Sequence, residues 1–216
     1  EDRPTISFHV DAVQSLAKVA TEVYLPERVD FATFSSHKFH GLRGVGFVYI
    51  KEGKKITPLL TGGGQEKEMR STTENVAGIA ATAKALRLAM ENQEAFANKT
   101  QQMKEVIRKE LANYPDVTIF SGEDHFAPHI LTFGIKGVRG EVVVHAFEEF
   151  DIYISTTSAC SSKAGKPAGT LIAMGVDKSI AQTAVRLSLD LEKDMSQVEQ
   201  FLTKFKLIYE QTRKVR

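Results

Sequence analysis

The fold is decided by the stretch Phe34-Ser35-Ser36-His37-Lys38-Phe39-His40-Gly41. It follows a run of strand-forming residues at 29–34 and precedes another at 45–50. A hydroxyl, an imidazole and an amine are therefore presented where a strand gives way to a glycine-containing loop. In open α/β sheets this edge, outside the carboxyl ends of the strands, is where ligands bind. Most loop lysines are nevertheless solvated surface charges, so a binding site here needs support from other parts of the chain.

The composition narrows the class of protein. The chain has 216 residues, of which 42% are hydrophobic and 25% are charged, as in an ordinary globular protein. Its net charge of +1 argues against an electrostatically driven nucleic-acid binder. No apolar run approaches the ~20 residues of a membrane span, and no signal-peptide pattern is present. The single cysteine excludes an internal disulfide, so we expect a cytoplasmic protein. From the charge and the short apolar runs we expect neither a nucleic-acid partner nor a membrane partner.

The order of the expected elements divides the chain into two parts. Residues 1–95 alternate strand-like runs with loops and end in a long helix, as expected for part of a large α/β domain. The apolar face predicted for that helix consists of Val76, Ile79, Ala80, Ala83, Leu86 and Met90. Residues 96–216 mix helices with short strand-like runs, which favours a smaller α+β domain.

The two ends of the sequence carry further expectations. The last helix should bury a face made of Val198, Phe201, Leu202, Phe205, Ile208 and Tyr209. Ser196 and Glu199 have the spacing of a capping box at its start. At the other end, residues 1–60 hold few strands for a closed α/β sheet, and no initiator methionine is present. We therefore expect the chain to be the later part of a longer protein.

A carboxylate and an amide follow the first strand-like run. Asp11 and Gln14 lie just beyond residues 5–10. An aspartate at a strand end is commonly the N-cap of a helix. Alternatively, it pairs with a protonated ring nitrogen, as in enzymes that use pyridoxal phosphate, where the cationic ring takes up carbanion charge. Gln14 would then donate a hydrogen bond to the phenolate oxygen of that ring.

Lys38 would supply the amine for the aldehyde of such a cofactor. A lysine held as an imine is displaced by a substrate amine and is then free to move protons. Ser35 and His37 flank it and can bind a phosphate. The glycine turn at 62–64, followed by hydroxyl residues that include Thr73, is a second candidate phosphate-binding segment. The alternative for this segment is a flexible connector that ends in a helix cap.

Cys160 lies in a loop of small and polar residues. A lone cysteine is usually a small buried hydrophobe. Here Lys163 and Lys166 would favour the thiolate, and the composition is typical of an exposed loop. An accessible thiol on a movable segment suits a nucleophile that must reach a substrate and later leave it.

Arg186 lies in the strand-like run at 184–189. Period-two alternation puts Val185 and Leu187 on one face of this strand and Arg186 on the other. One interpretation is a surface arginine paired with Asp190. The other is a bidentate clamp on the carboxylate of an amino acid, which a planar guanidinium holds better than a lysine does.

Together these motifs resemble those of cysteine desulfurases, which are pyridoxal-phosphate enzymes of the class V aminotransferase family with fold type I. The segments that carry the resemblance follow the order seen in that family and are residues 9–15, 35–38, 62–66, 70–75, 158–161 and 186–189. The long loop around Cys160 resembles that of the subgroup that serves iron–sulfur cluster assembly and tRNA thiolation. The resemblance implies the carboxyl-terminal part of the large cofactor-binding domain over 1–95 and the small domain with the catalytic cysteine over 96–216.

The resemblance also implies roles in cofactor binding. Pyridoxal 5′-phosphate would be held by Asp11, Gln14, Ser35, His37 and Lys38, the last of them covalently. Thr73 would reach the cofactor of the neighbouring subunit, which implies a homodimer. No metal ligand is implied.

The remaining implied roles concern the substrate. Arg186 would bind the carboxylate of L-cysteine, and Cys160 would attack its sulfur. The products would be alanine and a persulfide on Cys160, which passes its sulfur to an acceptor or iron–sulfur scaffold protein.

The sequence also departs from the family. Family members usually have glycine where Thr72, Thr157 and Asp190 stand, which puts the backbone at those positions in question. The family's N-terminal residues that stack on the ring and bind phosphate cannot be located, so we expect the isolated chain to bind the cofactor poorly and to be inactive. The alternatives are a related lyase acting on selenocysteine or cysteine sulfinate, and a non-catalytic module that docks sulfur acceptors.

Overall fold

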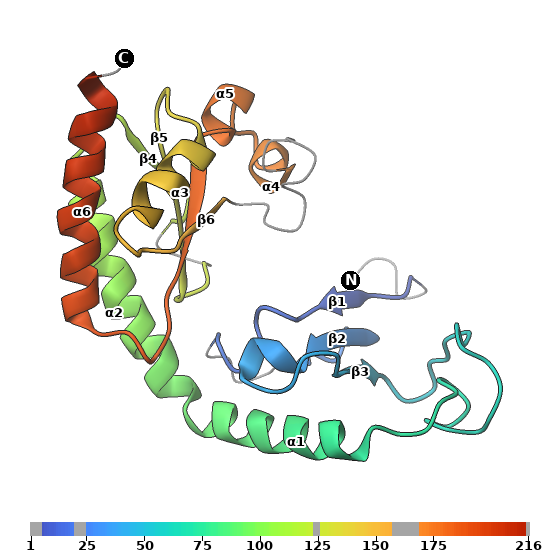
Figure 1. Ribbon diagram of the computed structural model, residues 1–216. Helices are drawn as coiled ribbons and strands as arrows, with labels where there is room; N and C mark the ends of the chain where they lie inside the picture. The colour runs from blue at the N-terminus through green and yellow to red at the C-terminus, as the bar shows by residue number, and fades with distance from the viewer. Residues whose placement is uncertain (1–5, 20–24, 123–125, 157–168, 215–216) are drawn as a thin grey trace. The chain divides into compact units, whose positions relative to one another are not determined.

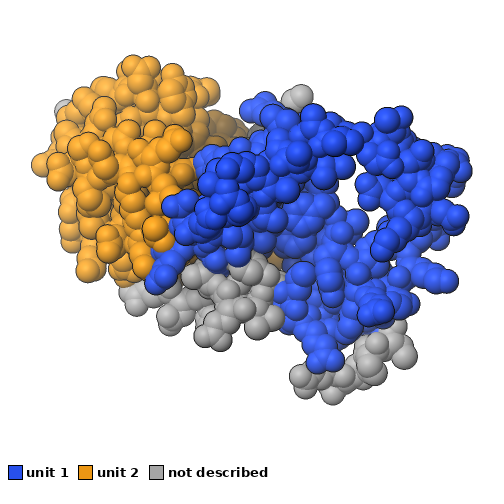
Figure 2. Space-filling view, turned by 90° about the horizontal axis from the view of Figure 1, so that it is seen from below, with its two compact units in different colours: residues 1–94 blue, residues 95–216 orange. Residues whose placement is uncertain are grey.

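The computed structural model describes residues 6–19, 25–122, 126–156 and 169–214 (Figure 1). The chain divides into two compact units, Glu1–Glu94 and Ala95–Arg216, which Figure 2 colours separately. Each unit contains a sheet of its own, and each is described by itself.

The first unit contains, in its described residues, a three-stranded sheet in the order β1-β2-β3. Its elements are β1 (His9–Asp11), β2 (Phe31–Ser35), the 3₁₀ helix η1 (Ser36–Phe39), β3 (Gly46–Ile50) and α1 (Val76–Glu91). β1 and β2 run parallel, whereas β2 and β3 run antiparallel. The strands predicted on either side of the Lys38 stretch are confirmed, and β1 is shorter than the run at 5–10 suggested.

One face of this sheet packs against α1. The helix contributes Ala85, Leu86 and Ala89 to the core. The buried residues that they meet are Ala12, Leu16, Val29, Ala32, Phe34 and Phe39. Because side chains alternate along a strand, the polar positions of β1 and β2 lie on the opposite face.

The face of α1 that packs is only partly the predicted one, since Leu86 packs against the core as expected. Val76 is 71% exposed and Ile79 is 47% exposed, although both belong to the expected apolar face. The buried positions are instead Gly78 and Thr82. A Cβ atom at position 78 would lie 2.8 Å from Cγ2 of Val45, so only a residue as small as glycine lets the helix lie this close to the loop before β3. Close approach, and not the number of apolar side chains, selects the packing face.

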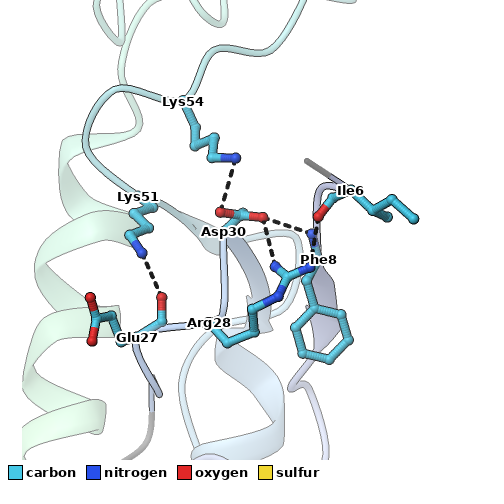
Figure 3. A network of polar contacts seen from close by, with 7 residues as sticks. All are labelled: Ile6, Phe8, Glu27, Arg28, Asp30, Lys51 and Lys54. Carbon is cyan, nitrogen blue, oxygen red and sulfur yellow. Dashed lines mark hydrogen bonds and ion pairs between the residues drawn. The ribbon is translucent and has the colours of Figure 1, made fainter. Parts of the chain in front are cut away.

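A buried carboxylate aligns β1 with β2 (Figure 3). Asp30 is only 4% exposed; it accepts a hydrogen bond from the backbone N–H of Phe8 at 2.8 Å and forms ion pairs with Arg28 and Lys54, each at 3.2 Å. Arg28 also donates to the carbonyl of Ile6 at 2.7 Å. The pKa of Asp30 is lowered, chiefly by the Phe8 N–H and further by the two cations. The charged carboxylate thereby holds the segment before β1 beside the start of β2.

The second unit has a four-stranded antiparallel sheet in the order β4-β5-β7-β6. The strands are β4 (Val117–Ile119), β5 (Ile130–Ile135), β6 (Ser155–Thr156) and β7 (Ala184–Ser188). The helices are α2 (Gln93–Leu111), α3 (Gly140–Glu148), α4 (Gly169–Ala173), α5 (Lys178–Ala181) and α6 (Met195–Lys214). α2 begins two residues before the boundary between the units. These strands and helices agree with the mixed α+β composition predicted for this part of the chain.

Helices α2, α3 and α6 supply the core on one face of this sheet (Figure 1). Leu131, Phe133 and Val185 of the sheet are buried against them. The apolar face predicted for the last helix is confirmed, because Val198, Phe201, Phe205, Ile208 and Tyr209 all belong to this core and Leu202 packs against it. Arg186, next to Val185 in β7, therefore points to the other face.

The start of α6 corrects the predicted capping box. Asp194, and not Ser196, is the capping residue: its Oδ1 accepts the backbone N–H of Ser196 at 2.9 Å and that of Gln197 at 3.3 Å. The side chain of Gln197 in turn accepts the N–H of Asp194 at 3.0 Å. The reciprocal pair is thus Asp194 with Gln197, two residues before the pair that the sequence suggested.

Candidate active site

Two parallel strands bring Asp11 and Ser35 to the same edge of the first sheet. Asp11 is paired in register with Thr33, two residues before Ser35 at the end of β2. The side chains of these three residues lie on the face opposite α1. His9 lies on this face as well, with its Nε2 3.3 Å from the Thr33 hydroxyl. The carboxyl ends of β1 and β2 therefore present an acid and a hydroxyl side by side, as the sequence predicted for a ligand edge.

Asp11 does not cap a helix. Its Oδ1 accepts the N–H of Val13 at 3.1 Å, and the chain continues as a series of turns up to residue 18. The N-cap interpretation of Asp11 is therefore wrong, and the local bond leaves the second carboxylate oxygen available to a ligand. Gln14, in the same turn, is exposed.

The turn that carries Lys38 is closed tightly on itself. η1 is followed by His40 in the left-handed conformation, with φ 66°, and the N–H of Gly41 donates to the carbonyl of Ser36 at 3.0 Å. Phe39 is buried in the core and fixes the turn to the unit. Lys38 is half-buried, and its amine makes no hydrogen bond or ion pair with any residue that the structure describes.

The groups at this edge fit pyridoxal phosphate. Ser35 stands at the N-cap of η1 without making a side-chain capping bond, so its hydroxyl remains available, and His37 beside it is exposed. A hydroxyl and an imidazole next to an unpaired amine can bind a phosphate and an aldehyde of one molecule. Asp11 supplies the anion that a protonated ring nitrogen requires.

The glycine turn before α1 is held by a hydroxyl. The N–H of Gly63 donates to Oγ of Ser71 at 2.9 Å, and Gly62 has φ +146°, which favours glycine. Thr72, where the family usually has glycine, does not have a positive φ, so threonine fits there without strain.

Thr73 is not a helix cap. Asn75 caps α1 by accepting the N–H of Gly78 at 3.0 Å, which contradicts the expectation of a Ser/Thr cap. Thr73 is exposed and forms no hydrogen bond within the part of the chain that the structure describes. Its hydroxyl is available for a ligand or a second subunit.

In the second unit, Arg186 lies in the middle of a polar row. Its Cα partners are Thr132 on β5 and Ser155 on β6, so the three side chains share the face that the core helices leave open. Its Nε is buried and has no hydrogen-bond partner among the described residues. A buried donor without an acceptor is suited to an anionic ligand.

Thr132 and Ser155 were missed by the sequence reasoning. They lie 54 and 31 positions before Arg186, and only the strand register brings them beside it. Ser155 also begins the strand that leads into the segment containing Cys160. Cys160 itself and Thr157 lie outside the described residues.

Apart from Thr73, the predicted site residues that the structure describes fall into two groups. Asp11, Gln14 and the residues at 35–38 gather at one sheet edge of the first unit, whereas Arg186 belongs to the second unit. No group of three metal-ligating side chains occurs within the ranges that the structure describes. None of the helices in those ranges is long and apolar enough to cross a membrane.

Comparison with known families identifies the chain. Residues 3–201 match the model of the aminotransferase class-V family. The chain belongs to this family. The family predicted from the motifs is thereby confirmed.

Curated relatives narrow the resemblance. The chain is 49% identical over 215 residues to a NifS/IcsS protein homolog of Lactobacillus delbrueckii, covering 99% of this chain and 56% of the relative. It is 37% identical over 205 residues to the cysteine desulfurase IscS of Clostridium botulinum, covering 92% of this chain and 51% of the relative. The chain therefore spans about half the length of the curated relatives it matches.

Solved structures agree on the fold. A NifS-like protein superposes with a TM-score of 0.82 and 36% identity, over 96% of this chain and 52% of the other. A NifS-like protein from Rickettsia africae superposes with a TM-score of 0.83 and 30% identity, over 94% of this chain and 54% of the other. The predicted α/β class, the fold of type I pyridoxal-phosphate enzymes, is confirmed.

Proposed function

We propose that this chain supplies the cofactor lysine and the sulfur-accepting cysteine of a cysteine desulfurase that converts L-cysteine to L-alanine. The observation that carries the proposal is the edge where parallel β1 and β2 end, which presents Asp11 next to the closed turn of Lys38. Relatives named cysteine desulfurase support it.

Pyridoxal phosphate, when bound, supplies an electron-withdrawing ring that takes up charge from an amino-acid substrate. Lys38 would hold it through Nζ, and the same amine can accept or donate a proton. Asp11 would keep the ring nitrogen protonated, and Gln14 would donate a hydrogen bond to the phenolate oxygen of the ring. Ser35 and His37 would bind its phosphate. The unpaired Lys38 amine and the unused Ser35 hydroxyl are the structural support for these roles.

Arg186 binds the carboxylate of L-cysteine, and Thr132 and Ser155 line the same row. The buried, unpartnered Nε supports this role, because a carboxylate oxygen would accept a hydrogen bond from its N–H. The Cys160 thiolate then attacks the substrate sulfur: a new S–S bond forms at its Sγ as the C–S bond of cysteine breaks. The electron pair of the broken bond stays with Cβ, which takes up a proton and becomes the methyl group of alanine. Alanine leaves, and Cys160 carries the sulfur as a persulfide.

The assembly follows from the same proposal. Residues 1–95 belong to the large cofactor-binding domain, and residues 96–216 form the small domain with the cysteine loop. Thr73 contacts the cofactor of a second subunit in a homodimer, for which its exposed, unbonded hydroxyl is available. The persulfide passes to a sulfur acceptor or iron–sulfur scaffold protein in the cytoplasm.

The test uses this chain joined to the part of the Lactobacillus relative that lies outside the matched region, hereafter the extended protein. With pyridoxal phosphate and L-cysteine it should release alanine and carry a persulfide on Cys160, detected by alkylation and mass spectrometry. Lys38→Ala and Cys160→Ser should each abolish alanine release, whereas Lys84→Ala, on the exposed side of α1, should not. Alanine release that survives Cys160→Ser would contradict the proposal.

A further inference from the structure

A buried pair of hydroxyls joins α1 to the turn that carries Lys38. Oγ1 of Thr82 lies 2.9 Å from Oγ of Ser36, although the two residues are 46 positions apart. Thr82 is 7% exposed and Ser36 is 0% exposed, so water cannot replace this bond. We propose that Thr82 is a positioning residue for Lys38 and acts through Ser36. The inference rests on the function proposed above.

The two hydroxyls satisfy each other. Thr82 also lies 2.8 Å from the carbonyl of Gly78, one turn earlier in α1. A hydroxyl has a single proton but two lone pairs. When Thr82 donates to Gly78, it still accepts the proton of Ser36, and both buried groups are paired. Removal of the Thr82 oxygen leaves the Ser36 hydroxyl buried without this partner.

Ser36 is the pivot of the Lys38 turn. Its carbonyl accepts the N–H of Gly41, while its side chain is held by α1. A Cβ atom at position 41 would lie 1.8 Å from Oγ of Ser36, so the chain folds back directly over this hydroxyl. His37 and Lys38 are the next two residues of the same 3₁₀ turn. A shift of Ser36 therefore moves the lysine as well.

The contact is suited to fixing an amine. Covalent catalysis requires the reacting groups to be held within a fraction of an ångström, and the backbone of a short 3₁₀ turn is weakly held by its own bonds. The bond from α1 adds a fixed point on a rigid helix. Thr82 touches neither cofactor nor substrate in this proposal, and it acts only through the turn.

The experiment compares Thr82→Val with Thr82→Ser in the extended protein loaded with pyridoxal phosphate. The first readout is the pH midpoint of the absorbance change of the bound cofactor, which reports the surroundings of Lys38 Nζ. The second is the rate at which the cofactor is lost on dilution, followed by borohydride reduction and peptide mapping at Lys38. Valine should shift the midpoint and speed the loss roughly two- to tenfold, as expected for one hydrogen bond. Serine, which keeps the hydroxyl, should behave like the parent.

Thr100→Val is the matched control. Thr100 is also buried, and its hydroxyl bonds only within its own helix, to the carbonyl of Phe96 at 2.7 Å and that of Ala97 at 3.3 Å. It should lower stability without moving the absorbance midpoint. Equal midpoints in Thr82→Val and Thr100→Val would overturn the inference, as would a serine variant that behaves like the valine variant.

A second variant covers the case in which Thr82→Val does not fold. Ser36→Ala should shift the midpoint in the same direction, and a parent-like midpoint would overturn the inference. Failure of the proposed function is recognised separately, because the parent then gives no reduced adduct at Lys38. In that case hydrogen exchange of the Gly41 N–H, which is bonded to the Ser36 carbonyl, is the deciding measurement. Exchange must be faster in the double variant that combines Thr82→Ser with Ser36→Ala than in the single variant Thr82→Ser, because only the double variant lacks the hydroxyl of Ser36. Equal exchange rates would overturn the role of the hydroxyl pair.

Discussion

Arg186 is the residue whose surroundings most directly call for a ligand. Its Nε is buried and unpartnered among the described residues, and an unpaired buried donor costs roughly 1–3 kcal/mol. Arg186→Lys in the extended protein keeps the charge but loses the planar fork. We expect KM for L-cysteine to rise roughly tenfold with a smaller change in kcat, measured from steady-state alanine release.

The control for this change is Arg139→Lys. Arg139 is an exposed arginine whose ion pair with Glu141 spans 3.5 Å at the surface, so its replacement should leave KM unchanged. The role of Arg186 would be wrong if Arg186→Lys left KM at the parent value.

Asp30, which holds β1 beside β2, makes the stability of the fold depend on pH in the acid range. Its pKa is lowered in the folded protein, first by the N–H of Phe8, so its contribution to stability is complete above the ordinary aspartate pKa. That contribution is lost as the pH falls through the lowered value. Asp30→Asn should therefore unfold at lower urea concentration near neutrality and should show a shallower loss of stability in acid.

Urea unfolding of the chain at a series of acid pH values measures this effect. Asp151→Asn is the control, because Asp151 is exposed and has φ 57°, a conformation that asparagine adopts readily. An Asp30→Asn variant with the acid dependence of the parent would show that the Asp30 network does not carry it.

Lys104 affects stability in the alkaline range, whereas Asp30 acts in the acid range. It is 2% exposed and donates to the carbonyl of Ala127 at 2.9 Å, and burial lowers its pKa. Between the lowered and the ordinary lysine pKa the unfolded chain binds more protons, so stability rises with pH across that window. Lys104→Met should abolish this alkaline rise and should be at least as stable as the parent near neutrality. Unfolding midpoints between neutral and alkaline pH measure it, and an alkaline rise that persists in the variant contradicts the account.

At the scale of helices and strands, sequence patterns predicted the features that are set by residues close together in the chain. The 3.6-residue period located the buried face of α6, since a helix against a broad core must bury its apolar stripe. The same rule located the buried face of α1 only in part: Leu86 packs against the core, but Gly78 and Thr82 also face inward, and at position 78 the neighbouring loop leaves no room for a larger residue. The polar row at Arg186 was predicted only in part. The alternation of apolar and polar residues along β7 predicted that Arg186 lies on the polar face, but its neighbours Thr132 and Ser155 depend on the register between strands that are distant in the sequence.

The cap of α6 gives a test at this scale. Asp194 accepts two helical N–H groups, and its pKa is lowered chiefly by the Ser196 hydroxyl. Asp194→Ala should lower the thermal midpoint of the chain, because those two groups lose their acceptor. Glu199→Ala, at the position that the sequence pattern suggested, should change the midpoint much less. Equal effects of the two substitutions in thermal unfolding would show that the cap is assigned incorrectly.

At the scale of the whole molecule, the chain spans about half the length of the relatives that it matches. The isolated chain presents the Lys38 edge without the remainder that those relatives contain. We expect it to bind pyridoxal phosphate poorly and to release no alanine from L-cysteine. Alanine production by the purified 216-residue chain, measured by amino-acid analysis, would contradict this expectation.

The most direct measurement is the site of covalent attachment of the cofactor. The extended protein is incubated with pyridoxal phosphate, reduced with borohydride, digested and mapped by tandem mass spectrometry. A single pyridoxyl group on Lys38, absent from Lys38→Ala and retained in Lys84→Ala, is the predicted result. A pyridoxyl group on another lysine, or an adduct that persists in Lys38→Ala, would contradict the assignment on which the proposed chemistry depends.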